Sequence, residues 1–154
     1  MIAGLKFRRL DYLADQLGGS LARRFAGELG EEVVVTPVPL GRWRRLRRGF
    51  DQAEALATVV ARESDKKLVS LLERQRSTPP QSLAGFEARR ANLQGAFRVR
   101  PVAAAPWRGC HIVLVDDVVT TGATLEAAAS ALLEAGIPSV TALVAGRTAA
   151  PGER

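Results

Sequence analysis

The sequence predicts an α/β fold with a mainly parallel sheet flanked by helices. Apolar or β-branched runs alternate along the chain with segments of helical periodicity, as they do in parallel α/β proteins. The 154 residues suit one domain with a sizeable core, and 47% hydrophobic with 25% charged residues is ordinary for a globular protein. We therefore expect a single domain over residues 1–154, with ligands gathered at the carboxyl ends of its strands.

The first half of the chain supplies a helix, a strand and a second helix. Leucine and phenylalanine at four-residue spacing predict an amphipathic helix over residues 5–29, which Gly18-Gly19 could split or bend. The β-branched run 33–36 predicts a short buried strand that ends at the prolines after it. A second helical pattern spans 51–63, and residues 68–72 are favoured as the next strand because a crossover helix precedes them.

The second half opens with a long polar segment. Residues 74–98 hold Pro79-Pro80 and five arginines, and so long a polar stretch inside a domain is usually functional, so we expect a flexible hood or lid. Residues 102–106 indicate a connector. A strand at 112–115, a helix from 124 to about 135 closed by a glycine and a proline, and a final strand at 140–145 complete the alternation.

Charge and cysteine content limit the class of protein. Nineteen arginines against three lysines, with a net charge of +6, favour phosphate-rich partners such as a nucleotide or a nucleic acid. The single cysteine, Cys110, and the single histidine, His111, leave no internal disulfide and no zinc site built from Cys and His. No apolar run approaches the ~20 residues of a spanning helix, and the N-terminus has no apolar signal core, so we expect a cytoplasmic protein.

One motif carries most of the functional information. The apolar run 112–115 leads into Asp116 and Asp117, and a Thr-Thr-Gly-Ala-Thr segment then opens a helix. Free N–H groups at a helix start favour a phosphate, the threonines add hydroxyl donors, and Gly122 lets the backbone approach an anion. Carboxylates beside such a cradle would hold hydroxyls or a metal, so the motif indicates a sugar phosphate with Mg²⁺. The alternative is an ordinary strand–turn–helix whose aspartates cap the helix.

These residues resemble the phosphoribosyl-pyrophosphate (PRPP) motif of the type I phosphoribosyltransferases. The resemblance implies that Asp116 and Asp117, the catalytic pair, hold the ribose 2′- and 3′-hydroxyls. Mg²⁺ would bind through the ligand, with the same two carboxylates as further candidate ligands. The 5′-phosphate would lie in the loop that follows, made of Val118, Val119, Thr120, Thr121, Gly122, Ala123 and Thr124.

Further segments are similar to the ComF family of competence-associated and amidophosphoribosyltransferase-like proteins. They are Pro37-Val38-Pro39-Leu40, the run from Arg48-Gly49-Phe50-Asp51 to Glu54, Thr78-Pro79-Pro80-Gln81, and Arg89-Arg90 to Phe97. The resemblance extends from about Leu5 to Arg147. The chain departs from the family in lacking its usual N-terminal Cys-rich zinc module and in having Asp51 where Asn is common. Purine-salvage relatives carry an Asp, which contacts the base, where this chain has Thr120.

The family motifs also imply outer parts of the site. The pyrophosphate side would use the turn Pro39, Leu40, Gly41 and Arg42 together with Arg48, the alternative being a plain strand-ending turn with solvated arginines. Arginine forks suit phosphate oxygens, so a lid with Gln81, Arg89, Arg90 and Asn92 could close over pyrophosphate. The alternative for this segment is a mobile loop without a ligand.

The resemblance thus implies a PRPP-binding protein that uses Mg²⁺ and transfers the phosphoribosyl group to an unknown acceptor with release of pyrophosphate. Two alternatives stand beside it: a regulator that binds PRPP or a nucleotide without catalysis, and an accessory protein of DNA uptake. We expect single-stranded DNA binding to be weak and incidental. A competence-machinery partner and self-association are compatible with the family, and no membrane partner is expected.

Overall fold

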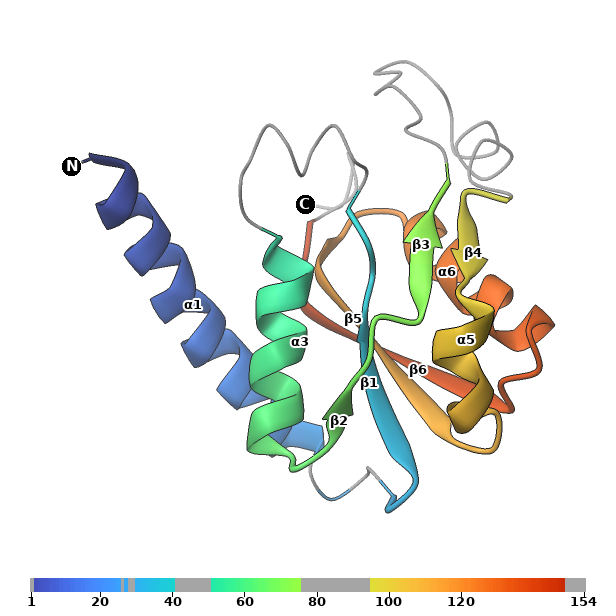
Figure 1. The fold of residues 1–154 in the computed structure, drawn as a ribbon. Helices are drawn as coiled ribbons and strands as arrows, with labels where there is room; N and C mark the ends of the chain where they lie inside the picture. The colour runs from blue at the N-terminus through green and yellow to red at the C-terminus, as the bar shows by residue number, and fades with distance from the viewer. Residues whose placement is uncertain (1, 26, 28–29, 41–50, 76–94, 149–154) are drawn as a thin grey trace.

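The alternation of strands and helices predicted from the sequence is present in the computed structural model (Figure 1), which describes residues 2–25, 27, 30–40, 51–75 and 95–148. Its elements are α1 (Ile2–Phe25), β1 (Val33–Pro37), α3 (Gln52–Glu63), β2 (Lys67–Leu68), β3 (Leu72–Arg74), β4 (Phe97–Val99), α5 (Pro101–Ala104), a 3₁₀ turn (Ala105–Trp107), β5 (His111–Val119), α6 (Ala123–Glu134) and β6 (Ser139–Arg147).

The main sheet is parallel, with strand order β2-β1-β5-β6, and β3 pairs with β4 in a separate antiparallel ribbon. Helices α1 and α3 cover one face of the main sheet, while α6, α5 and the β3–β4 ribbon lie on the other (Figure 1). The predicted fold class is therefore confirmed. None of the helices in the described ranges combines the length and apolarity that crossing a membrane requires.

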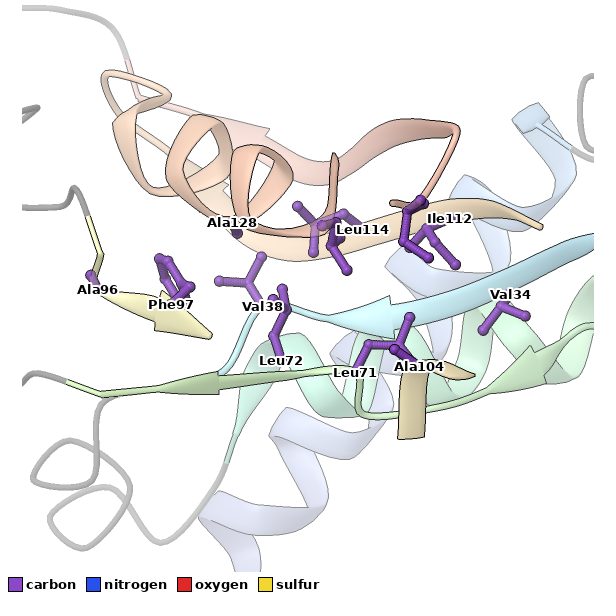
Figure 2. Packing of buried hydrophobic residues seen from close by; sticks show 12 residues of the cluster. Val34, Val38, Leu71, Leu72, Ala96, Phe97, Ala104, Ile112, Leu114 and Ala128 are labelled. Atoms are coloured by element: carbon purple, nitrogen blue, oxygen red, sulfur yellow. The ribbon is translucent and has the colours of Figure 1, made fainter. Parts of the chain in front are cut away.

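Alternation along the central strands divides the core between the two faces. In β5, Val113 and Val115 pack with α3, whereas Ile112 and Leu114 pack with α6 and the ribbon (Figure 2). All four side chains are fully buried, as expected of a parallel strand covered on both sides. The central strands thereby fix the position of whatever follows them.

Strand β1 ends before its neighbour β5 does. Strand β1 ends at Pro37, opposite Val115 of β5, and the N–H of Val38 donates to the Val115 carbonyl at 2.8 Å. Beyond this point β5 continues to Val119 beside β6 alone. Among the described residues, β5 therefore has no neighbouring strand on its β1 side from Asp116 onward.

The glycine pair in α1 does not split the helix, which was one of the two effects considered possible from the sequence. A Cβ built on Gly18 would lie 2.7 Å from the Cβ of Val59, so this glycine permits close packing of α1 on α3. Packing against α3 compensates for the low helix propensity of the pair.

Residues 68–72 form parts of two sheets rather than one strand. The N–H of Val69 still donates to the Val35 carbonyl, but the N–H of Leu71 donates to Oγ1 of Thr36, the buried polar side chain of the described core. The chain then leaves the main sheet and enters β3. Residues 102–106, expected to be a connector, are instead helical, because Pro101 at the helix start leads into three alanines.

The predicted lid begins and ends in ordered structure. Arg74 pairs with Phe97 in the β3–β4 ribbon, and the N–H of Gln75 donates to the Ala96 carbonyl at 2.8 Å. The expected loop bounds of 74 and 98 were therefore too wide. Residues 76–94 lie outside the described part of the chain, so the lid itself remains a prediction.

Candidate functional site

The acidic pair lies within the overhanging end of β5, and backbone hydrogen bonds orient both carboxylates. The N–H of Asp117 donates to Oδ1 of Asp116 at 2.9 Å, and the N–H of Val118 donates to Oδ1 of Asp117 at 2.8 Å. Both residues are partly buried. Because β1 has already ended, the carboxylates occupy the edge of the sheet where ligands collect in this fold class.

Asp116 is electrostatically unusual. Its pKa is raised from 3.8 to about 7, chiefly because burial disfavours the charged form and also because of the like charges of Asp117 and Asp51, while the hydrogen bond from the Asp117 N–H acts in the opposite direction. Near neutral pH the Asp116 side chain is therefore present in both its protonated and its ionised form. A cation or a set of hydroxyl donors would favour its ionised form.

Val118 and Val119, expected in the phosphate loop, are instead the last residues of β5, because they pair with Gly146 and Arg147 of β6. The loop that remains, from Thr120, turns sharply into α6. Gly122 caps this helix with φ +82°, a left-handed conformation that favours glycine, and a Cβ there would meet no atom within 4 Å. Oγ1 of Thr121 accepts from the N–H of Ala123 at 3.4 Å. Open space thus faces the start of a twelve-residue helix, where backbone N–H groups and the helix dipole attract an anion.

The structure brings some of the predicted site residues together. Pro39 and Leu40 follow β1, half-buried, at the same edge of the sheet as the acidic pair and residues 118–124. The other predicted pyrophosphate and lid residues lie outside the described residues: Gly41, Arg42, Arg48, Gln81, Arg89, Arg90 and Asn92.

Asp51 is a site residue that sequence reasoning missed. It caps α3, its Oδ1 accepting from the N–H of Glu54 at 3.2 Å, and its charge raises the pKa of Asp116. A signal was available in the sequence, because the helix that follows a strand in a parallel sheet begins at the carboxyl edge. The position had been noted only as a departure from the usual Asn of the family.

The acidic side chains of the site can be compared with the ligands that the expected Mg²⁺ prefers. Within the described ranges no group of three or more His, Cys, Asp or Glu side chains is placed to hold a metal ion. Asp116 and Asp117 are hard oxygen donors of the kind that Mg²⁺ prefers, and Mg²⁺ in such sites keeps waters and takes further ligands from substrate phosphates. The residues therefore fit an ion shared with a phosphorylated ligand rather than one held by protein alone.

Comparison with models of known protein families shows the family to which this chain belongs. A family model described as "Phosphoribosyl transferase domain" matches residues 16–151. This chain belongs to that family. The match includes both the acidic pair and the loop before α6, so the resemblance drawn from the motif is confirmed.

Curated relatives agree with the ComF resemblance. The chain is 36% identical over 151 residues to the DNA utilization protein YhgH of Escherichia coli (strain K12), 34% over 108 residues to Competence protein F of Haemophilus influenzae, and 36% over 103 residues to Competence protein ComFC of Bacillus subtilis. These alignments cover 91%, 70% and 67% of this chain. They cover 63%, 47% and 39% of the relatives, so the chain spans less than two thirds of their length.

Solved structures share the fold. The glutamine PRPP amidotransferase of B. subtilis, complexed with ADP and GMP, superposes with a TM-score of 0.58 at 23% identity, over 86% of this chain and 26% of that enzyme. The protein TT1426 from Thermus thermophilus superposes with a TM-score of 0.51 at 19% identity, over 92% of this chain and 85% of that protein. At these identities the likeness concerns the fold alone.

Proposed function

We propose that this protein binds PRPP at the overhanging end of β5 and transfers its 5-phosphoribosyl group to an acceptor with release of pyrophosphate. The observation that carries the proposal is the sequence of groups along one edge. Two backbone-oriented carboxylates near the end of β5 are followed, after residues 118–121, by a left-handed glycine and a helix start. Carboxylates accept from ribose hydroxyls and helix N–H groups donate to phosphate, so the arrangement suits a phosphorylated sugar.

The transfer requires little covalent chemistry from the protein. A lone pair on the acceptor forms a bond to C1 of the ribose, and the C1–O bond to pyrophosphate breaks with its electron pair leaving on pyrophosphate. A proton on the acceptor is lost to solvent. Asp116 and Asp117 would hold the sugar while positive charge develops on its ring, and among the described residues they are the candidate protein ligands for Mg²⁺. When bound, Mg²⁺ would supply Lewis-acid neutralisation of the leaving group.

A second function is supported by the relatives rather than by the site. Their names refer to DNA utilization and competence, and the chain carries a net charge of +6. A protein that binds PRPP as a signal, or that assists DNA uptake without catalysis, would fit these names. A cytoplasmic location, competence-machinery partners and self-association stay predictions.

The first experiment measures ligand affinity in the double variant Asp116→Asn with Asp117→Asn. Calorimetry with Mg²⁺ present should show that the affinity for PRPP falls far more than the affinity for inorganic phosphate, because the lost contacts are to ribose hydroxyls. The expected loss is about 1.5–3 kcal/mol for each charged hydrogen bond removed. Equal weakening of both ligands would show that the carboxylates do not recognise the sugar. Pyrophosphate release with a panel of acceptors then separates the enzyme from the silent regulator.

A further inference from the structure

The last strand of the main sheet has one side that no described strand occupies. Strand β6 is the outer strand of the order β2-β1-β5-β6 (Figure 1), so among the described residues it pairs with β5 alone. Its register with β5 stays constant from the pair His111–Ser139 to the pair Val119–Arg147, so no bulge interrupts the strand. Strand β6 therefore presents an uninterrupted edge of nine residues.

One hydrogen bond shows which backbone groups of β6 face outward. The N–H of Thr148 donates to the Val119 carbonyl at 3.0 Å, so the even-numbered residues of β6 direct their N–H and C=O groups at β5. Because successive residues of a strand alternate, the odd-numbered residues direct theirs away from β5. These outward residues are Ser139, Thr141, Leu143, Ala145 and Arg147. Their backbone groups can form hydrogen bonds with a further strand.

The two edges of the main sheet differ in their protection against such pairing. At the opposite edge, β2 has two residues, Lys67 and Leu68, and the Lys67 ammonium lies 5.1 Å from the centre of the Trp107 ring. A short edge strand that carries a lysine discourages pairing with another chain. From Ser139 to Gly146, β6 has neither a charged residue nor a proline. Of the two edges, β6 alone is therefore suited to pairing, so association would stop at two copies rather than continue into a fibre.

The β6 edge is also held in place by the rest of the protein. The ring nitrogens of His111 in β5 lie 2.6 Å from Oγ of Ser139 and 3.0 Å from Oγ1 of Thr141, which ties the first part of β6 to its neighbour. Leu143, in the middle of the strand, is fully buried, whereas the small side chain of Ala142 is exposed. A strand that is already ordered loses little conformational freedom when it pairs.

We propose that β6 pairs with β6 of a second copy of this chain, antiparallel and centred on Leu143, so that the two main sheets become one. This register uses the whole strand and places Ala142 opposite Val144 of the second copy. The one charged residue of the strand, Arg147, then lies opposite Ser139. A parallel arrangement would instead set the two Arg147 side chains against each other, and like charges directly opposite destabilise a strand pair.

The arrangement is independent of the proposed function and compatible with it. In an antiparallel pair the carboxyl ends of the two sheets lie at opposite edges, and β6 separates Asp116 and Asp117 of each copy from the other copy. Nine residues of strand span about 30 Å, and most of the contact is backbone. This interface belongs to the small end of specific interfaces, so we expect a dissociation constant in the micromolar range.

The first test is analytical ultracentrifugation of the full chain over a range of concentrations. An interface of this size predicts monomer at about 1 µM and dimer at about 1 mM. Ala142→Lys should raise the dissociation constant at least about tenfold, because two lysines would lie diagonally across the two-fold axis. Val102→Lys, at a valine 90% exposed on α5, adds the same charge away from β6 and should leave association unchanged. Monomer at every concentration, or equal effects of the two variants, overturns the proposal.

The second test, amide hydrogen exchange of the wild-type protein, identifies the strand without any substitution. The outward N–H groups of Thr141, Leu143 and Ala145 should exchange at least about threefold more slowly at about 1 mM than at about 10 µM, because pairing protects them. The N–H groups of Ala142 and Val144 face β5 and should be protected equally at both concentrations. Dimerisation without this alternation would place the contact on another surface and refute the proposal.

Discussion

Asp116 is the residue whose chemistry depends most on its surroundings. Its folded-state pKa of about 7 lies above the unfolded value of 3.8, chiefly because burial disfavours the charged form. The protonated carboxyl therefore contributes stability that is complete below pH 3.8 and is lost as the pH rises through 7. A ligand whose hydroxyls donate to this carboxylate must draw the proton off. We therefore expect binding of PRPP to release a proton in this range.

The charge of Asp51 can be removed without removing its cap. Asn caps a helix as well as Asp does, so Asp51→Asn should preserve the start of α3 while lowering the pKa of Asp116 through the loss of a like charge. The measurement is a carbon NMR titration of the Asp116 carboxyl. Asp65→Asn, at an exposed aspartate just beyond the other end of α3, is the matched control and should leave that pKa unchanged. An unaltered titration in Asp51→Asn would assign the shift to burial and Asp117 alone.

At the scale of elements, the packing of α1 on α3 depends on one of two adjacent glycines. Gly18→Ala would place a Cβ 2.7 Å from the Cβ of Val59, so we expect a loss of about 1–3 kcal/mol in the free energy of unfolding from overpacking. Gly19→Ala should instead stabilise the protein by up to about 1 kcal/mol, because its Cβ meets the flexible end of Arg23 at 3.4 Å and alanine favours a helix. Urea denaturation of both variants checks this pair. Similar effects of the two substitutions would contradict it.

The two ends of α6 offer a second matched pair. Gly122 begins the helix with φ +82° and Gly136 follows its end with φ +88°, and a Cβ at either position meets nothing within 4 Å. Alanine at each should therefore cost a similar amount, about 1–2 kcal/mol, from left-handed strain. Only Gly122→Ala should weaken binding of inorganic phosphate, since only that end presents N–H groups. Phosphate titrations showing equal affinity in the two variants would exclude the loop as the phosphate site.

Helices and strands were predicted well where neighbouring residues determine them, and less well where contacts between residues distant in sequence determine them. The buried runs around Val34 and Val113 and the helical pattern over residues 51–63 are set by neighbouring residues, and each element was predicted within a few positions. The division of residues 68–72 between two sheets depends on the Leu71–Thr36 hydrogen bond, which joins residues 35 positions apart. The continuity of α1 depends likewise on Val59, and neither contact is visible in a local pattern.

The candidate site shows the same limit. Asp116, Asp117 and Gly122 are contiguous in the chain, so their motif could be identified before the fold was known. Asp51 lies far from the acidic pair in sequence, and its nearness became evident only once α3 was placed on the sheet. Contacts of this kind contribute to the pKa of Asp116.

At the scale of the whole molecule, the net charge of +6 bears on the choice between a PRPP enzyme and a DNA-uptake protein. We expect weak single-stranded DNA binding that falls steeply with salt, because such attraction is mainly counterion release. Replacing Arg44, Arg45 and Arg47 with Ser, at positions outside the described residues, should lower DNA affinity and spare PRPP binding at residues 116–124. Paired titrations at ~150 mM salt, where the Debye length is about 8 Å, test this. Tight DNA binding that resists salt, with no PRPP affinity, would make the DNA-uptake function the better assignment.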